Sequence, residues 1–169
     1  MLAVLIAALH RYGAVVRGDQ SSIYIGAFSS IGDRSVVQSS AINPIGFSAR
    51  TYIGDYVTIG QGCLLRACTV DDGSVVGDGC ILQEGSLVDR GAMLEAGSLL
   101  PSGARVPSGE VYGGNPAVHI RKLQKEELAE FHSTAEQTVV LAAKHADEFL
   151  PYGSQYQLKE EMEAAKAGK

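Results

Sequence analysis

Two large polar side chains interrupt the stretch VTIGQGCLLRAC at residues 57–68. Gln61 and Arg66 stand in a run that otherwise contains Gly, Cys, Thr and aliphatic residues. Such a run predicts a packed core, in which polar groups are costly unless they have partners. These two positions are therefore the first candidates for a site, either one that does chemistry or one whose chemistry has been lost.

The other side chains that could act as nucleophiles, bases or metal ligands are scattered. His119, His132 and His145 fall in one expected helix at a spacing that does not give them a shared face, and His10 lies near the start. We expect these His to be surface or packing residues. The three Cys, at positions 63, 68 and 80, show no pairing pattern, which indicates a reducing compartment.

Composition limits the function classes. The 169 residues are 46% hydrophobic and 20% charged, which is typical of one globular domain with a substantial core. The net charge of −5 and the pI of about 5.3, with no basic cluster, exclude nucleic acid as a partner. No apolar run reaches the ~20 residues that span a bilayer. The longest, residues 2–9, fits either a first strand or the apolar core of a targeting segment.

An aliphatic residue recurs at every sixth position through most of the first 115 residues, and a small residue stands four places after most of them. The aliphatic series are Ile25, Ile31, Val37; then Ile53, Ile59, Leu65; then Val70, Val76, Leu82, Val88, Leu94, Leu100, Val106. A period of six matches neither the 3.6 of a helix nor the alternation of a simple strand.

This period predicts a triangular coil with one short strand on each side. Aliphatic residues point inward, small residues fit the corners, and successive coils stack at the ~4.8 Å spacing of a parallel sheet. The expected fold class is all-β, a left-handed parallel β-helix of hexapeptide repeats. A β-sandwich would instead need turn signals every 8–12 residues and an alternating face. The hexad at residues 65–69 is one residue short, which predicts that Cys63 and Cys80 stack as core thiols.

The β-helix is expected over residues 1–115, with an extruded loop at about residues 41–51, where the repeat is lost around Pro44 and Gly46. After the two glycines at 113 and 114, Asn115 could cap a helix and Pro116 suits a first helical turn. Apolar residues at helical spacing then predict a long α-helix over residues 116–150 that packs along the β-helix. Residues 151–169 are expected to form a tail or a short helix.

Several segments resemble the gamma-class carbonic anhydrases, in order along residues 12–123. They are VVRGDQSSIYIGAFSSIGD, IGDYVTIG, LLRACTV and PSGEVYGGNPAVHIRKL. The later segment HADEFLPYGSQY is similar to the carbonic anhydrase-like subunits attached to mitochondrial respiratory complex I in plants, algae and several protists.

The resemblance implies a zinc site that this chain has lost. In active members, three His hold zinc in clefts between the subunits of a trimer, and the metal lowers the pKa of a bound water to ~7. Their positions fall on Gln38, Gln61 and Arg66. We therefore expect no zinc, no other cofactor and no catalysis. The position before Asp33, where active members commonly carry a Gln, is Gly32.

The resemblance also implies an interface network of Arg17, Asp19 and Asp33, although these residues could instead be solvated bends of the coil. Coil stacking places Asp78 above Gln61, and Gln83 above Arg66 with Glu84 beside it. We expect Arg66 to pair with one of these acids, or with an acid of a neighbouring subunit, because an unpaired buried charge costs several kcal/mol.

The function implied by the resemblance is that of a non-catalytic structural subunit. It would form a heterotrimer with His-bearing gamma carbonic anhydrase paralogues and contact the membrane arm of complex I. Its place would be peripheral, on the matrix side of the mitochondrial inner membrane. The alternatives are a carbonic anhydrase with an altered site, an assembly module of another large complex, or a hexapeptide-repeat acyltransferase. The last usually requires a base His in the coil, and residues 11–115 contain none.

Overall fold

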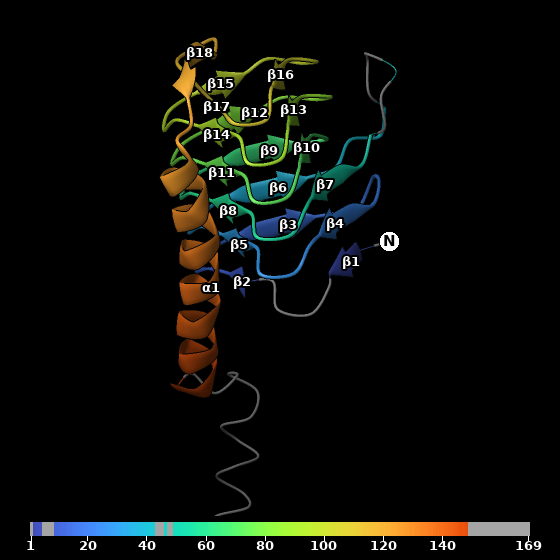
Figure 1. Ribbon diagram of the computed structural model, residues 1–169. Helices are drawn as coiled ribbons and strands as arrows, with labels where there is room; N and C mark the ends of the chain where they lie inside the picture. The colour runs from blue at the N-terminus through green and yellow to red at the C-terminus, as the bar shows by residue number, and fades with distance from the viewer. Residues whose placement is uncertain (1, 5–8, 43–45, 47–48, 149–169) are drawn as a thin grey trace, which may run out of the picture. The chain divides into compact units, whose positions relative to one another are not determined.

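The strands wind into a triangular coil in which every third strand joins the same sheet (Figure 1). The computed structural model describes residues 2–4, 9–42, 46 and 49–148. These divide into two compact units that meet between Val139 and Val140. All pairings between coils are parallel and in register, which confirms the left-handed parallel β-helix predicted from the six-residue period.

Three parallel sheets form the sides of the coil. Sheet A contains β1 (Leu2–Val4), β4 (Ile23–Ile25), β7 (Thr51–Ile53), β10 (Thr69–Val70), β13 (Leu87–Val88) and β16 (Arg105–Val106). Sheet B contains β2 (Leu9–His10), β5 (Ser30–Ile31), β8 (Thr58–Ile59), β11 (Val75–Val76), β14 (Met93–Leu94), β17 (Glu110–Gly113) and β18 (Val118–Lys122). Sheet C contains β3 (Val15–Arg17), β6 (Val36–Gln38), β9 (Leu64–Arg66), β12 (Ile81–Leu82) and β15 (Leu99–Leu100). Strands β1 and β2 show that part of the apolar run at residues 2–9 enters the first coil.

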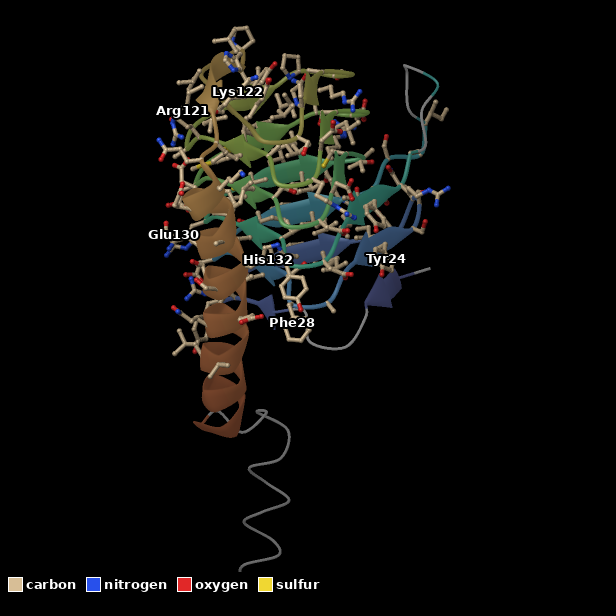
Figure 2. All side chains as sticks on the ribbon, in the orientation of Figure 1. Tyr24, Phe28, Arg121, Lys122, Glu130 and His132 are labelled. Carbon is tan, nitrogen blue, oxygen red and sulfur yellow. The ribbon has the colours of Figure 1, made fainter. Side chains whose placement is uncertain are left out.

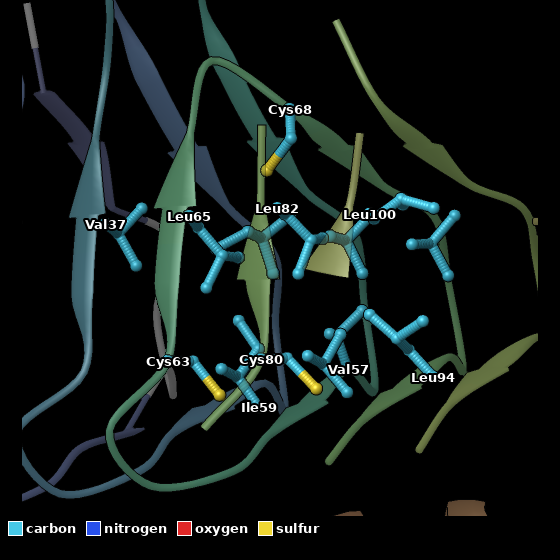
Figure 3. Packing of buried hydrophobic residues seen from close by; sticks show 14 of the residues in the cluster. Val37, Val57, Ile59, Cys63, Leu65, Cys68, Cys80, Leu82, Leu94 and Leu100 are labelled. Carbon is cyan, nitrogen blue, oxygen red and sulfur yellow. The ribbon is translucent and has the colours of Figure 1, made fainter. Parts of the chain in front are cut away.

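The core is a set of stacked rows, one per sheet. In sheet C the inward row passes through Val37, Leu65, Leu82 and Leu100, each at most 1% exposed (Figure 3). Cys63 and Cys80 are 1% and 0% exposed and lie one above the other beside this row. The prediction that they are stacked core thiols is therefore confirmed.

Aspartates at the corners hold successive coils together. The carboxylate of Asp55 accepts a hydrogen bond from the Ala27 N–H at 2.7 Å, and that of Asp72 accepts one from the Asp55 N–H at 3.0 Å. Each acid thus satisfies a backbone donor of the coil below, which would otherwise be left unpaired at a bend. The glycine before such a corner has no room for a side chain, because a Cβ at Gly54 would clash with the Asp72 carboxylate.

The end of the β-helix differs from the prediction. The helix does not start at Pro116, and Asn115 does not cap it. Residues 118–122 instead form strand β18, antiparallel to β17, and α1 (Lys125–Glu148) follows. An unpaired β17 edge would expose backbone donors and acceptors, and β18 satisfies them. Gln124 precedes the helix at the N-cap position, and its N–H donates to Glu127 Oε2 at 2.9 Å, which is the half of a capping box that the Glu supplies.

The first part of α1 packs against a column of corner residues. Gly73 and Gly91, both with positive φ, leave space that His132 and Leu128 occupy. Lower in the same column, Phe28 and Tyr56 stack with ring centroids 5.0 Å apart, and His132 lies 5.1 Å from Tyr56 (Figure 2). The predicted packing of the helix along the β-helix is confirmed at Leu128 and His132, and His132 is a packing residue.

The remaining predictions for the chain's end concern residues that are largely not described. Helix α1 continues to Glu148, the last described residue, so the predicted helix end at residue 150 and the expected tail at residues 151–169 lie outside the described part. No helix among the described residues is both long and apolar enough to cross a membrane.

Candidate functional site

Gln38 and Arg66 are neighbours at one edge of sheet C. Each is the last residue of its strand, and the register pairs Gln38 of β6 with Arg66 of β9. Arg17 ends β3 and is the register partner of Gln38 one coil below. All five strands of sheet C run in the same direction, so the residues that end them gather along one edge. We call this the ending edge of sheet C.

Gln61 lies at the opposite edge of the same sheet. It stands in the turn before β9, and its N–H donates to Asp78 Oδ1 at 2.7 Å. This confirms the expected stacking of Asp78 above Gln61. We call this side, which carries the residues that precede the strands, the starting edge of sheet C. Within a single chain, the three candidate positions therefore lie at two different edges of sheet C: Gln38 and Arg66 at the ending edge, and Gln61 at the starting edge.

Arg66 forms an ion pair with an acid of the next coil. Glu84 Oε1 lies 2.9 Å from Arg66 Nε, and the two side chains are 17% and 53% exposed. The hypothesis that Arg66 pairs with a stacked acid is confirmed, and the acid is Glu84 rather than Asp78. The same Oε1 accepts a hydrogen bond from Ser40 Oγ at 3.0 Å, a contact that the repeat pattern did not reveal.

The base of the extruded loop is fixed to this edge. Thr51 Oγ1 donates to the Gln38 carbonyl at 2.7 Å, and the Ser40 N–H donates to the Ala49 carbonyl at 3.1 Å. Ser40 and Thr51 are both buried. Together with the contact from Ser40 to Glu84, these bonds tie the two ends of the loop to the strand ends that carry Gln38 and Arg66.

The side chains at the three candidate positions do not fit zinc. Zinc takes thiolate, imidazole or carboxylate donors, whereas Arg66 is a permanent cation already engaged by Glu84, and the others are neutral amides. The described part of the chain contains no other group of three or more His, Cys, Asp and Glu that could hold a metal ion. His119, on β18, packs edge-on against Tyr112 with its Nε2 3.9 Å from Glu110 Oε2.

The backbone at Gly32 also leaves no room for a larger residue. Gly32 is buried, and a Cβ there would press on the carbonyl of Gly60 in the next coil. The Gln that the resemblance implies for active members at this position could not enter without a shift of the adjacent coil.

Arg17, Asp19 and Asp33 do not form one network within the chain. Arg17 Nη2 lies 2.8 Å from Asp19 Oδ2, and its hydrogen bond holds the pKa of Asp19 below the usual range. Asp33 instead accepts the Tyr12 N–H at 3.0 Å. That contact is the corner bond that Asp55 and Asp72 also make. The role of the three residues at a subunit interface stays a prediction.

Comparison with known proteins finds relatives that are named as gamma carbonic anhydrases or gamma carbonic anhydrase-like proteins. The chain is 55% identical over 137 residues to gamma carbonic anhydrase 3, mitochondrial, of Arabidopsis thaliana, covering 81% of this chain and 53% of that protein. It is 53% identical over 144 residues to gamma carbonic anhydrase-like 2, mitochondrial, of the same plant, covering 85% and 56%. The chain thus spans about half the length of these curated relatives. No protein-family model matches it.

A solved structure supports the same relationship. A hexapeptide transferase family protein from Anaplasma phagocytophilum is 37% identical, with a TM-score of 0.75, and the match covers 83% of this chain and 81% of that one. The β-helix, the order of its motifs and these similarities agree with one another. The chain belongs to the hexapeptide-repeat protein family, and within it the chain is similar to the mitochondrial gamma carbonic anhydrases and gamma carbonic anhydrase-like proteins.

Proposed function

We propose that the chain is a non-catalytic structural subunit of the gamma carbonic anhydrase-like type. It forms a trimer with His-bearing paralogues and is attached to the matrix side of the membrane arm of mitochondrial complex I, the NADH:ubiquinone oxidoreductase. The observation that carries the loss of catalysis is the ion pair between Arg66 and Glu84 at a position that the resemblance assigns to a zinc ligand.

The ion pair opposes metal binding in two ways. Arg66 stays protonated at any physiological pH, so it repels a dication and offers no lone pair. Glu84 is largely shielded and bonded to both Arg66 and Ser40, so turning its carboxylate toward a metal would break both contacts and leave Arg66 without its counter-charge.

The location and the partner are supported more indirectly. The two curated relatives described above are named as mitochondrial, and gamma carbonic anhydrase-like 2 shares 53% of matched residues with this chain. The attachment to complex I rests on the resemblance of residues 145–156 to complex I-attached subunits.

The loss of catalysis is tested by metal content and by activity. The purified chain, refolded or expressed with excess zinc, should retain far less than one zinc per chain after gel filtration and should not accelerate carbon dioxide hydration above buffer. Stoichiometric zinc together with hydration activity would instead identify an enzyme with an altered site.

The partner is tested in mitochondrial membranes of the source organism. Native electrophoresis with mass spectrometry of the bands should find the chain co-migrating with complex I and with a His-bearing paralogue. Migration with a different large assembly would support the assembly-module alternative, and a free pool alone would contradict attachment.

A hexapeptide acyltransferase is a second candidate, favoured by the name of the Anaplasma relative. His119 would have to act as the base, since it is the one described His with a carboxylate nearby, Glu110 at 3.9 Å. Acyl transfer to a panel of amine and hydroxyl acceptors that His119→Asn abolishes would support this function. Its absence in the wild-type chain would remove it.

A further inference from the structure

Backbone hydrogen bonds at the strand ends join each coil of the β-helix to the coil above. In sheet A, the residues that follow β10 and β13 donate in this way. The Asp71 N–H donates to the Val88 carbonyl at 2.8 Å, and the Asp89 N–H donates to the Val106 carbonyl at 2.9 Å. Each such donor needs a further coil above it. The last coil therefore has to end the series without leaving a donor that a strand of another chain can use.

The corresponding positions in the last coil are both prolines. Pro107 follows β16 and stands one coil above Asp89. In sheet C, the Gln83 N–H donates to the Leu100 carbonyl at 3.0 Å, and Pro101 follows β15 one coil above Gln83. Proline has no backbone N–H, so neither strand end offers a donor to a further strand.

The hairpin of β17 and β18 closes the rest of this end, where β15, β16 and β18 lie together (Figure 1). In sheet C, the Leu99 N–H donates to the Gly114 carbonyl at 3.0 Å, and the Leu99 carbonyl accepts the Ala117 N–H at 2.8 Å. In sheet B, the edge strand is β18. Its register with β17 passes over Ile120, which forms a bulge, and Lys122 is exposed. Bulges and lysines on an edge strand oppose pairing with a further strand.

We propose that the C-terminal end of the β-helix is closed against strand addition, and that Pro101 and Pro107 close the edges of sheets C and A. The position of the prolines in the chain supports this role. Residues 45–100, in which each coil has another above it, contain no proline. The first two prolines after this segment fall at the two strand ends that have no coil above them in the described part of the chain.

Closure of this end matters because each coil of a parallel β-helix is a template for the next. An open last coil would present donors at the spacing of a parallel sheet, and an extended segment of any chain could add to it. A protein partner at this end would therefore have to bind through side chains rather than by continuing a sheet. This inference goes beyond the proposed function and does not depend on it.

The closure is tested by restoring the two donors in the full-length chain. The variant Pro101→Ala/Pro107→Ala should stay folded, because Gln83 and Asp89 occupy the same positions one coil below. Small-angle X-ray scattering over a concentration series measures its length and its cross-section separately. Head-to-tail contacts do not close on themselves, so the maximum dimension should grow by about twofold or more while the cross-section stays that of the wild type.

The control is Val118→Ala, which alters an exposed residue at the same end and adds no donor. This variant and the wild type should show no elongated species at the same concentrations. A second measurement locates the contact. Hydrogen exchange of the amide that Pro107→Ala introduces should be at least about tenfold slower in the elongated particles than at low concentration, because a strand of another chain then covers it.

Three outcomes would overturn the proposal. The first is a folded double variant that keeps the wild-type dimensions at every concentration. The second is growth in cross-section rather than in length, and the third is elongation without protection of the new amide. If the double variant does not fold, the single variant Pro107→Ala is judged by the same three outcomes. None of these results bears on zinc content or on co-migration with complex I, so they leave the proposed function to its own tests.

Discussion

Glu84 of one coil neutralises Arg66 of the coil below, with 2.9 Å between Oε1 and Nε. The contact follows from parallel stacking: Leu82, the last residue of β12, is the register partner of Leu65, so the residues just after β12 lie above Arg66 at the end of β9. Glu84 also accepts a hydrogen bond from Ser40, so one carboxylate joins two coils and the base of the extruded loop. The ending edge of sheet C, where the resemblance predicts a metal ligand in active members, thereby carries an internal ionic contact.

Removing the charge of Glu84 should destabilise the chain. Glu84→Gln loses the ion pair with a half-exposed Arg66 and weakens the bond from Ser40, so the free energy of unfolding should fall by about 1 kcal/mol. Urea denaturation measures this. Arg17→Gln breaks the more exposed pair with Asp19 and should cost less stability than Glu84→Gln, because solvent screens that pair. Equal losses for the two variants would contradict the assignment of a special role to Glu84.

Restoring the three imidazoles should restore metal binding. The triple variant Gln38→His, Gln61→His, Arg66→His supplies the nitrogen donors that zinc prefers. Its zinc content after gel filtration, measured by mass spectrometry, should approach one per chain in the oligomeric fraction. A variant that keeps Arg66 should bind none, since the cation remains. A triple variant that oligomerises without zinc would show that the three positions were carried over wrongly.

A side chain added beneath the helix should destabilise more than one added in open space. Gly91 and Gly79 have similar φ values of +60° and +66°, so an alanine at either position pays the strain of the left-handed region, about 1 kcal/mol. At Gly91 the new Cβ would also lie 2.9 Å from Leu128, whereas nothing lies within 4 Å at Gly79. Gly91→Ala should therefore cost about 1 kcal/mol more than Gly79→Ala in chemical denaturation. Similar costs would mean that Leu128 moves aside freely.

The junction of β18 and α1 should weaken in acid. The hydrogen bonds from Arg121, followed by the bond from the Gln124 N–H, lower the pKa of Glu127 from 4.5 to about 2. A depressed pKa in the folded state contributes stability above pH 4.5, and this contribution is lost as the pH falls toward 2. Hydrogen exchange at the start of α1 should speed up across this range. Glu127→Gln should remove that pH dependence, and an unchanged profile in this variant would assign it to another group.

The core thiols should be inert in the folded chain. Burial raises the pKa of Cys68 to about 12, and all three Cys are at most 1% exposed. Because the thiolate is the reactive species, thiol reagents at pH 8 should label none of them within minutes, while all three should react in denaturant. Rapid labelling of the native chain would contradict the packing of this core.

The sequence by itself determined the coil, and its resemblance to a known family predicts that the zinc donors are lost. Neither an α-helix nor a simple strand repeats every six residues. The inward positions of Val37, Leu65 and Leu82 and the stacking of the thiols could therefore be predicted from the spacing alone. The stacking of Asp78 above Gln61 followed from the same arithmetic. These features repeat locally, and each coil constrains the next.

Tertiary structure decided the features that break the repeat. Pro116 suggested a helix start, but the open edge of β17 recruited residues 118–122 as a strand, because unpaired backbone groups cost more than a local preference. The surface that α1 packs against is made of four corner residues, Phe28, Tyr56, Gly73 and Gly91. They lie far apart in the chain and form one column only when the coils stack on one another. The hydrogen bond from Ser40 to Glu84 likewise depended on the tertiary structure, because the repeat is lost in the extruded loop that begins next to Ser40.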